Sequence, residues 1–281
     1  VQNTPINCPA TPVWVAPTAT DACDATVTVT FTDATTQGSC AGTYSVTRTW
    51  TASDNCDNTS TCSATIVVQD ITPPTITCVA QTTPINCPAV PVFIPPTATD
   101  ACDATVAITF TDATTQGSCA GTYTVTRTWT ATDDCGNTAT CSGTIVVQDI
   151  TPPTITCVAQ TTPINCPAVP VFTPPTATDA CDATVTITFT DATTQGTCAG
   201  TYSVTRTWTA TDDCGNTATC TGTIVVRDNT PPTITCVAQT SPINCPAVPV
   251  FNAPTATDAC DGTVTISFTD ATTQGSCAGT Y

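Results

Sequence analysis

The chain of 281 residues carries 21 acidic and 4 basic side chains, and its formal net charge is -17. Such a surface excludes nucleic acid binding, which needs clustered Lys and Arg. Leu, Lys, Glu, His and Met are absent, while Thr, Val and Ile abound. Because Leu, Lys, Glu and Met, four good helix formers, are missing and β-branched residues abound, the chain is predicted to be all-β. No apolar run suggests direct membrane insertion of this segment.

The sequence repeats with a period of 79 residues. The string "PINCPA" begins at Pro5 and returns at Pro84, Pro163 and Pro242. Each period ends in a valine-rich stretch followed by Pro-Pro, which cannot join a β-ladder and forms a stiff extended link. These joints predict four domains, of which the first and last are truncated: 1–71, 72–150, 151–229 and 230–281. They are called the first to fourth repeats below.

Short alternating segments predict the strands of each period, here taken in the third repeat. Thr184–Asp191 places Val185, Ile187 and Phe189 on one face. Thr201–Asp212 follows after the turn-forming stretch 191–200, and segment 221–228 closes the repeat. Several short strands separated by turn clusters are typical of an Ig-like β-sandwich. We therefore predict a tandem array of disulfide-bonded Ig-like domains, each about 30–40 Å long with its linker.

The 21 cysteines could form a metal site, a redox centre or structural disulfides. Metal sites usually include His or C-x2-C pairs, and this chain has neither. Domains of about 80 residues bury a thin core, so disulfides are the usual means of stabilising them outside the cell. The cysteines therefore predict three disulfides per period and an oxidising, extracellular setting.

Spacing leaves 15 connectivities open for six cysteines, and the expected topology narrows them. Cysteines early in the first and last strands should meet, as should those of "TDAC" and "TDDC" at one end of the sandwich. The remaining two are then paired, and Cys62 is left without a partner. The predicted pairs are Cys8–Cys40, Cys23–Cys56, Cys78–Cys141, Cys87–Cys119, Cys102–Cys135, Cys157–Cys220, Cys166–Cys198, Cys181–Cys214 and Cys245–Cys277.

The segment "TWTATDDCGNTATCTGTIVVRDNTPPTITC" (207–236) resembles the hyalin-repeat (HYR) module and its bacterial relatives. The preceding "GTCAGTYSVTRTWTATD" (196–212) is similar to tandem repeats of giant Bacteroidota surface proteins, including adhesins of the gliding-motility type. The resemblance implies an Ig-like fold and an adhesive or fibrous role at the cell surface. It supplies no catalytic residue.

Two further sets of residues are candidate sites. Alternation places Arg48, Arg127 and Arg206 on the apolar face, so each should stack on an aromatic ring or pair with an Asp as a structural anchor; the alternative is a ligand-binding cation. Loop carboxylates are ligands that Ca²⁺ accepts, although acids are also ordinary in turns. The Ca²⁺ candidates are Asp179, Asp182, Asp212, Asp213 and Asp228, and no other cofactor is expected.

The lack of His, Lys and Glu removes ordinary general bases other than Asp, so no enzyme is expected. Near-identical copies favour a property that grows with number, such as length or avidity. We predict a stalk or fibre segment of an extracellular surface filament or adhesin, with copies of itself as partners. The alternative is a multivalent module that binds surface glycans or proteins. Regular Thr arrays also leave ice binding open.

Overall fold

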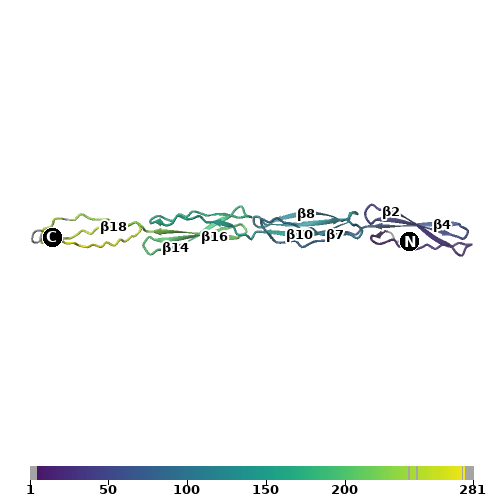
Figure 1. Cartoon of the computed structure of the whole chain (residues 1–281), viewed down its shortest axis with the longest axis horizontal. Helices are drawn as coiled ribbons and strands as arrows, with labels where there is room; N and C mark the ends of the chain where they lie inside the picture. Colours follow the sequence, from purple (N-terminus) through teal and green to yellow (C-terminus); the bar gives the residue numbers. More distant parts are fainter. Residues whose placement is uncertain (1–4, 240, 245, 274, 276–281) are drawn as a thin grey trace. The chain divides into compact units, whose positions relative to one another are not determined.

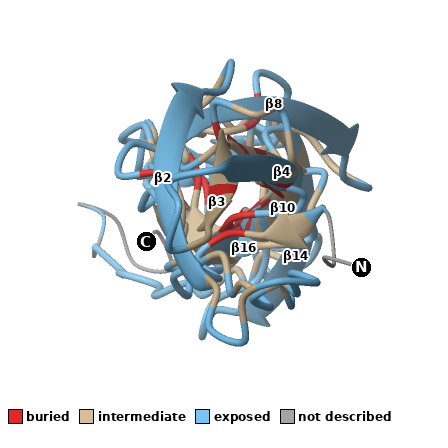
Figure 2. Ribbon diagram, turned by 90° about the vertical axis from the view of Figure 1, so that its right-hand side faces the viewer, coloured by how far each residue is buried: buried red, intermediate tan, exposed pale blue. Residues whose placement is uncertain are grey.

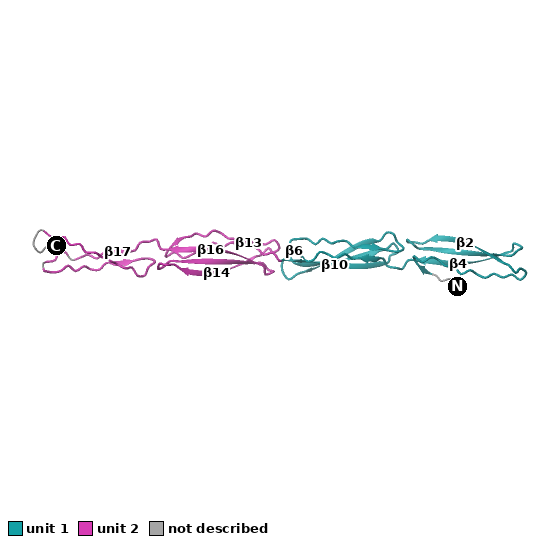
Figure 3. Ribbon diagram, turned by 60° about the horizontal axis from the view of Figure 1, so that its bottom comes forward, with its two compact units in different colours: residues 1–149 teal, residues 150–281 magenta. Residues whose placement is uncertain are grey.

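The computed structural model describes residues 5–239, 241–244, 246–273 and 275. These residues form strands, turns and extended segments without any helix. They divide into two compact units, Val1–Asp149 and Ile150–Tyr281, each described by itself (Figure 3). Each unit contains two of the predicted repeats.

The second repeat is complete and defines the module (Figure 1). Three long strands form an antiparallel meander, and a two-residue strand adds in parallel to its last member, which gives the sheet order β6-β10-β9-β8. A separate two-stranded sheet, β5-β7, opens the repeat, and β5 contacts β10. The strands are β5 (Thr75–Thr77), β6 (Ile85–Asn86), β7 (Thr97–Thr99), β8 (Ala107–Gln116), β9 (Tyr123–Thr132) and β10 (Thr138–Gln148).

The third repeat builds the same module one period later. Its four-stranded sheet has the order β12-β16-β15-β14, and its two-stranded sheet is β11-β13. The strands are β11 (Thr154–Thr156), β12 (Ile164–Asn165), β13 (Thr176–Thr178), β14 (Thr186–Gln195), β15 (Tyr202–Thr211) and β16 (Thr217–Arg227).

The first and fourth repeats each show part of the module among the described residues. The first has the four-stranded sheet β1-β4-β3-β2, and the fourth has the two-stranded sheet β17-β18. The strands are β1 (Ile6–Asn7), β2 (Thr28–Gln37), β3 (Tyr44–Ser53), β4 (Thr59–Gln69), β17 (Thr233–Thr235) and β18 (Thr255–Thr257).

The core of each module is thin and lies along one face of the two central strands. In the second repeat Trp129, Ala131 and Ile145 are 3%, 0% and 1% exposed. The outer strands β2 and β8 are exposed throughout their length (Figure 2). An alphabet without Leu or Met fills the core with one Trp and a few β-branched residues, which explains why covalent cross-links are needed.

The all-β, Ig-like prediction is confirmed, and the strand predictions need two changes. Strand β14 continues to Gln195, so the turn shrinks to the segment between Gly196 and Thr201, where the Gly196 N–H donates to the Thr201 carbonyl at 2.8 Å. The short strands β6, β7, β12 and β13 were not predicted, because two or three residues carry too little periodicity. The four domain boundaries stay a prediction.

Candidate functional site

The joint between the first and second repeats is crossed by two disulfides. Cys8 is bonded to Cys102 with the Cα atoms 5.9 Å apart, and Cys40 is bonded to Cys135 with the Cα atoms 5.2 Å apart. The sequence separations are 94 and 95 residues, longer than one period. The backbone is therefore one of three covalent connections between these repeats.

Topology brings these cysteines to facing ends of the two sheets. Cys8 follows β1, and its N–H donates to the Gln69 carbonyl at the end of β4. Cys40 lies in the turn between β2 and β3, at the same end, because Tyr44 pairs with Val68. In the next repeat, the loop after β7 and the β9–β10 turn hold the two partner cysteines. Neighbouring ends of successive sheets thus present their sulfur atoms to each other.

The backbone conformation and close contacts of Gly42 at this joint require a glycine. Its φ of +70° is a conformation that L side chains rarely adopt. A Cβ atom built on Gly42 would lie 2.9 Å from both the Cys8 Sγ and the Cys102 Cβ. The glycine therefore allows the backbone of the turn to approach the disulfide closely.

Hydrogen bonds add polar contacts at the joint. The Ala41 N–H donates to the carboxylate of Asp134, with distances of 3.0 and 2.9 Å to its two oxygens. The Asn137 side-chain amide donates to the Asp70 carbonyl at 3.3 Å. These contacts fix the turn of one repeat against the turn of the next.

The linker itself is held by Asn7. Its side-chain oxygen accepts from the Ile71 N–H at 3.0 Å, and its amide donates to the Thr72 hydroxyl at 2.5 Å. The same arrangement recurs in the second unit, where Asn165 accepts from the Asn229 N–H at 2.9 Å and donates to the Thr230 hydroxyl at 2.8 Å. The segment before Pro-Pro is thereby fastened to the repeat that precedes it.

The second unit also has a disulfide between repeats. Cys166 of the third repeat is bonded to Cys260 of the fourth, again 94 residues away. Gly200, with a φ of +69°, has its Cβ position 2.7 Å from the Cys260 carbonyl oxygen and 3.3 Å from the Cys166 Sγ. The same disulfide geometry thus recurs within each of the two units.

The third disulfide of the period lies within a repeat. Cys78 is bonded to Cys141 and Cys157 to Cys220, each across 63 residues, as the sequence predicts. These bonds connect the end of the two-stranded sheet to the last long strand. They close the sandwich around the tryptophan, because the strand register places Cys141 opposite Trp129.

Several predicted local pairs are wrong. The pairs Cys8–Cys40, Cys102–Cys135 and Cys166–Cys198 do not form, because Cys8, Cys40, Cys102, Cys135 and Cys166 are bonded across joints and Cys198 is unpaired. Cys23–Cys56 is also wrong, since both thiols are free. The topology argument located the cysteines at the correct ends, but it assumed that sulfurs at one end bond to each other instead of to the facing repeat.

The remaining cysteines complete the picture for the described residues. Cys87, Cys119, Cys181 and Cys214 are all disulfide-bonded, and the pairs Cys87–Cys119 and Cys181–Cys214 stay predictions. Cys62 is free, as predicted, and so is Cys236. The predicted pair Cys245–Cys277 lies outside the described residues.

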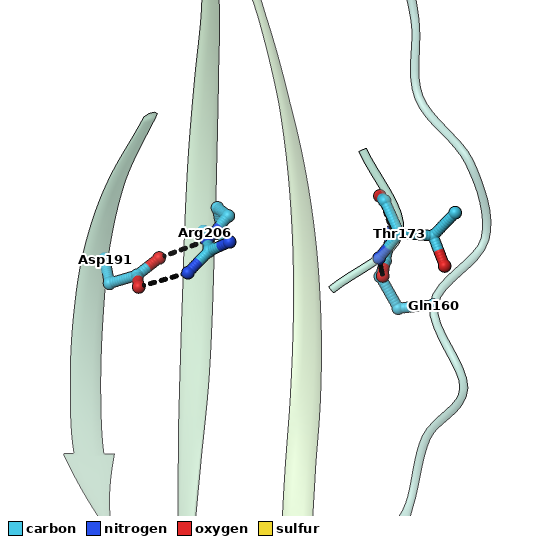
Figure 4. Close-up of polar contacts among 4 residues, drawn as sticks. All are labelled: Gln160, Thr173, Asp191 and Arg206. Atoms are coloured by element: carbon cyan, nitrogen blue, oxygen red, sulfur yellow. Dashed lines mark hydrogen bonds and ion pairs between the residues drawn. The ribbon is translucent and has the colours of Figure 1, made fainter. Parts of the chain in front are cut away.

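The arginine in each long central strand is held by an acid and by aromatic rings. Arg206 donates from Nε and Nη2 to the two oxygens of Asp191, both at 2.7 Å (Figure 4). Its guanidinium carbon lies 3.8 Å from the ring centre of Phe189 and 4.5 Å from that of Phe172. Phe172 in turn meets the buried Trp208 edge-on. The predicted anchor thus has both expected kinds of partner, and the same contacts recur at Arg48 and Arg127.

The hydrogen bonds between arginine and aspartate also shift the pKa values of both partners. The hydrogen bonds from Arg206 hold the pKa of Asp191 below its usual value, and the same bonds raise the pKa of Arg206. The ion pair therefore stays formed at neutral pH.

Three of the Ca²⁺ candidates accept hydrogen bonds from neighbouring backbone or side-chain groups of the same repeat. Asp182 accepts from the backbone N–H groups of Thr184 and Asp213, at 2.8 and 2.9 Å, and these bonds lower its pKa. Asp212 accepts from the backbone and side chain of Asn216, both at 2.8 Å. Asp179 accepts from the N–H of Cys181 at 2.7 Å.

At the joint between the third and fourth repeats, two carboxylates lie close to each other. Asp228 and Asp258 lie with the Cys260 sulfur within 4.8 Å of one another, but that sulfur belongs to a disulfide. Two carboxylates are fewer than the six to eight oxygen ligands that Ca²⁺ takes. Ca²⁺ binding, including at Asp213 and Asp228, stays an untested hypothesis beside its alternative, ordinary acids of turns.

Some joint residues were missed by sequence reasoning. Gly42, Ala41 and Asp134 had no assigned role, although "CAG" recurs in every period and "DDC" in the second and third repeats. Gln160 was also missed: its side chain accepts from the Thr173 N–H at 2.8 Å and donates to the Thr173 carbonyl at 3.0 Å (Figure 4). It fastens the long extended segment of the repeat, which has no strand pairing of its own.

Residues 69–147 and 148–226 match the model of the HYR domain. No match was found among curated proteins. Within the described residues there is no helix with the length and apolar character needed to cross a membrane.

Solved structures of cadherin arrays resemble the chain only weakly. Drosophila N-cadherin EC1-4 is 12% identical with a TM-score of 0.31, over 67% of this chain and 58% of that one. Protocadherin gamma B2 domains 1-5 are 13% identical with a TM-score of 0.31, over 72% and 53%. Protocadherin gammaB7 EC3-6 is 15% identical with a TM-score of 0.33, over 83% and 77%. The chain thus spans little more than half of the first two structures.

Proposed function

The chain belongs to the HYR domain family, and we propose that it is a load-bearing stalk of a cell-surface filament or adhesin. Tandem HYR repeats are non-enzymatic structural or adhesion modules of the extracellular type. The observation that carries this proposal is the pair of disulfides joining the first repeat to the second. A binding module needs stable domains, whereas a stalk also needs joints that resist bending and extension.

The joint has the parts that such a role requires. Tension on the backbone linker is shared with two disulfides, Cys8–Cys102 and Cys40–Cys135. The turn contacts between Ala41 and Asp134 resist rotation of one repeat against the other. Pro73 and Pro74 add a stiff link. The disulfides also suit an extracellular location, where they persist.

Electron microscopy of the full chain, unreduced and after mild reduction, tests the proposal. We expect an unreduced thread whose persistence length falls several-fold when the joint disulfides are reduced, because the linker alone then resists bending. Reduced molecules in which the repeats stay folded, shown by circular dichroism, provide the control. A persistence length that reduction leaves unchanged would overturn the stalk. Reproducible glycan binding by single repeats would favour the adhesion module.

A further inference from the structure

Two carboxylates lie close together at the joint between the first and second repeats. Asp70 directly follows β4 and Asp100 directly follows β7, and one oxygen of each lies within 4.8 Å of the other. Asp70 is only 7% exposed. Two negative charges at this distance repel each other, and more strongly where water is excluded. The pair is therefore unfavourable unless a cation or a proton lies between the two groups.

One oxygen of Asp70 lacks a partner in the part of the chain that the structure describes. Asp70 Oδ1 accepts from the Thr72 N–H at 3.0 Å, whereas Asp70 Oδ2 is buried and has no hydrogen-bond donor among the described residues. Asp100 bonds to its own loop with Oδ1, which accepts from the N–H groups of Cys102 and Asp103 at 2.7 and 3.1 Å. A buried carboxylate oxygen without a donor is costly. The buried oxygen of Asp70, directed at a second carboxylate, therefore indicates a missing ligand.

The same pair of carboxylates recurs in the second unit. Asp228 and Asp258 also lie within 4.8 Å of each other. Each again uses Oδ1 for the backbone, accepting from the N–H groups of Thr230 and Cys260 at 3.0 and 2.8 Å. Within each unit, one carboxylate of the pair comes from the repeat before the joint and the other from the repeat after it.

We propose that Asp70 and Asp100 bind a hydrated divalent cation of the Mg²⁺ type. The number of protein ligands distinguishes the ions, because Ca²⁺ takes six to eight oxygens, whereas Mg²⁺ keeps several waters and is held by one or two carboxylates. The neighbouring sulfur of Cys102 is bonded to Cys8 and is too soft a ligand for such an ion. Asp70 Oδ2 is the buried ligand, and the half-buried Asp100 lies on the side open to water.

The ion adds an electrostatic contact between two repeats that fold without it. The net charge of -17 concentrates cations near the chain, and weak extracellular cation sites have dissociation constants on the order of 1 mM. At an ion concentration near that value, the melting temperature rises by about a degree at most. Binding therefore has to be measured directly.

Titration of the full chain with Mn²⁺, which prefers oxygen ligands as Mg²⁺ does, tests the proposal. The electron paramagnetic resonance signal of free Mn²⁺ is followed at neutral pH and physiological ionic strength. We expect Asp70→Asn and Asp100→Asn each to remove one bound Mn²⁺ per chain, and the double variant to remove no more than one, because the two residues share the ion. Excess Mg²⁺ should displace the same Mn²⁺.

Asp21→Asn is the matched control for these variants. Asp21 lies one period before Asp100 and makes the same loop hydrogen bonds, to the N–H groups of Cys23 and Asp24 at 2.7 and 2.9 Å. Among the described residues it belongs to no cluster of possible metal ligands. The substitution removes the same charge from the same loop, so we expect it to leave the number of bound Mn²⁺ ions unchanged.

Asp70→Asn also separates loss of the site from loss of the fold. Its carbonyl oxygen can still accept from Thr72 and its amide can donate to Asp100, so without metal this variant should melt no lower than the parent chain. Equal Mn²⁺ counts for Asp70→Asn, Asp100→Asn and Asp21→Asn would overturn the proposal and leave a proton or a water as the partner of Asp70 Oδ2. Displacement of Mn²⁺ by Ca²⁺ but not by Mg²⁺ would overturn the choice of ion. None of these outcomes bears on the stalk proposal, which rests on the joint disulfides.

Discussion

Cys40, in a turn of the first repeat, is disulfide-bonded to Cys135, in a turn of the second. The bond connects two hairpins that share no backbone pairing. It converts a flexible contact between turns into a covalent one, and with Cys8–Cys102 it brackets the Pro-Pro linker. The stability of a repeat and the stiffness of its joint therefore depend on different disulfides.

Removing the disulfide Cys40–Cys135 should make the joint between the first two repeats more flexible without unfolding the repeats. For Cys40→Ser/Cys135→Ser we expect a broader distribution of maximum dimensions in small-angle scattering and an unchanged circular dichroism spectrum. The matched variant Cys78→Ser/Cys141→Ser should do the reverse, lowering the unfolding free energy of the second repeat by about 2–4 kcal/mol. Identical behaviour of the two variants would contradict the division of roles.

Gly42→Ala should prevent the Cys8–Cys102 bond from closing. The added methyl group would lie 2.9 Å from the Cys8 sulfur, and φ of +70° is unfavourable for alanine. Gly136→Ala is the control, because Gly136 has a φ of +89° but no atom within 4 Å of its Cβ position. Peptide mapping without reduction should find free Cys8 and Cys102 thiols only in Gly42→Ala. A normal bond in that variant would show that the turn can move aside.

Arg206→Lys should destabilise the third repeat by a few degrees in melting temperature. Lysine cannot reproduce the two parallel hydrogen bonds to Asp191 or the stacking on Phe189. Arg227→Lys, at the exposed end of β16, should change the melting temperature by less than a degree or so, as expected for a surface substitution. If both variants melt like the parent chain, the contacts of Arg206 with Asp191 and Phe189 contribute nothing measurable to stability.

Stability should be constant at neutral pH and fall in acid. The pKa of Asp33, Asp112 and Asp191 is lowered in the folded state by hydrogen bonds from arginine, and backbone hydrogen bonds lower that of Asp103 and Asp182. The unfolded chain therefore binds protons first, starting near its ordinary Asp pKa of about 3.9. The stabilisation is complete above that value and is lost as the pH falls through the lowered folded pKa. Guanidinium unfolding midpoints at pH 7, 5, 3 and 2 would reveal this, and Asp112→Asn should weaken the dependence.

A chelator should leave the melting temperature unchanged. Both oxygens of Asp182 and of Asp212 already accept hydrogen bonds from the chain, so the loops have their folded shape without an ion. Calorimetry with EDTA and then with added Ca²⁺ measures this directly. A rise of several degrees on adding Ca²⁺ would instead locate a site, and Asp258→Asn would show whether it lies at the joint carboxylates.

Local features were predictable from the sequence, and contacts between repeats were not. Alternation placed Arg206 on the apolar face, and an aromatic ring and an Asp were its expected partners. The Cys157–Cys220 bond followed from Ig-like topology alone. Cys8 and Cys40 were paired wrongly because a period was treated as a closed unit. Identical copies conceal this error, since a cysteine one period further on looks the same in the sequence.

The joint disulfides make the first unit tolerant of cleavage. If a protease cuts between Ile71 and Thr72, the two pieces remain connected through Cys8–Cys102 and Cys40–Cys135. A single nick therefore releases nothing, and severing the joint requires the loss of one peptide bond and both disulfides. For a molecule exposed to hydrolytic enzymes, cleavage of one peptide bond in the linker therefore leaves the two repeats connected. An array of such joints keeps its length after single cuts in its linkers.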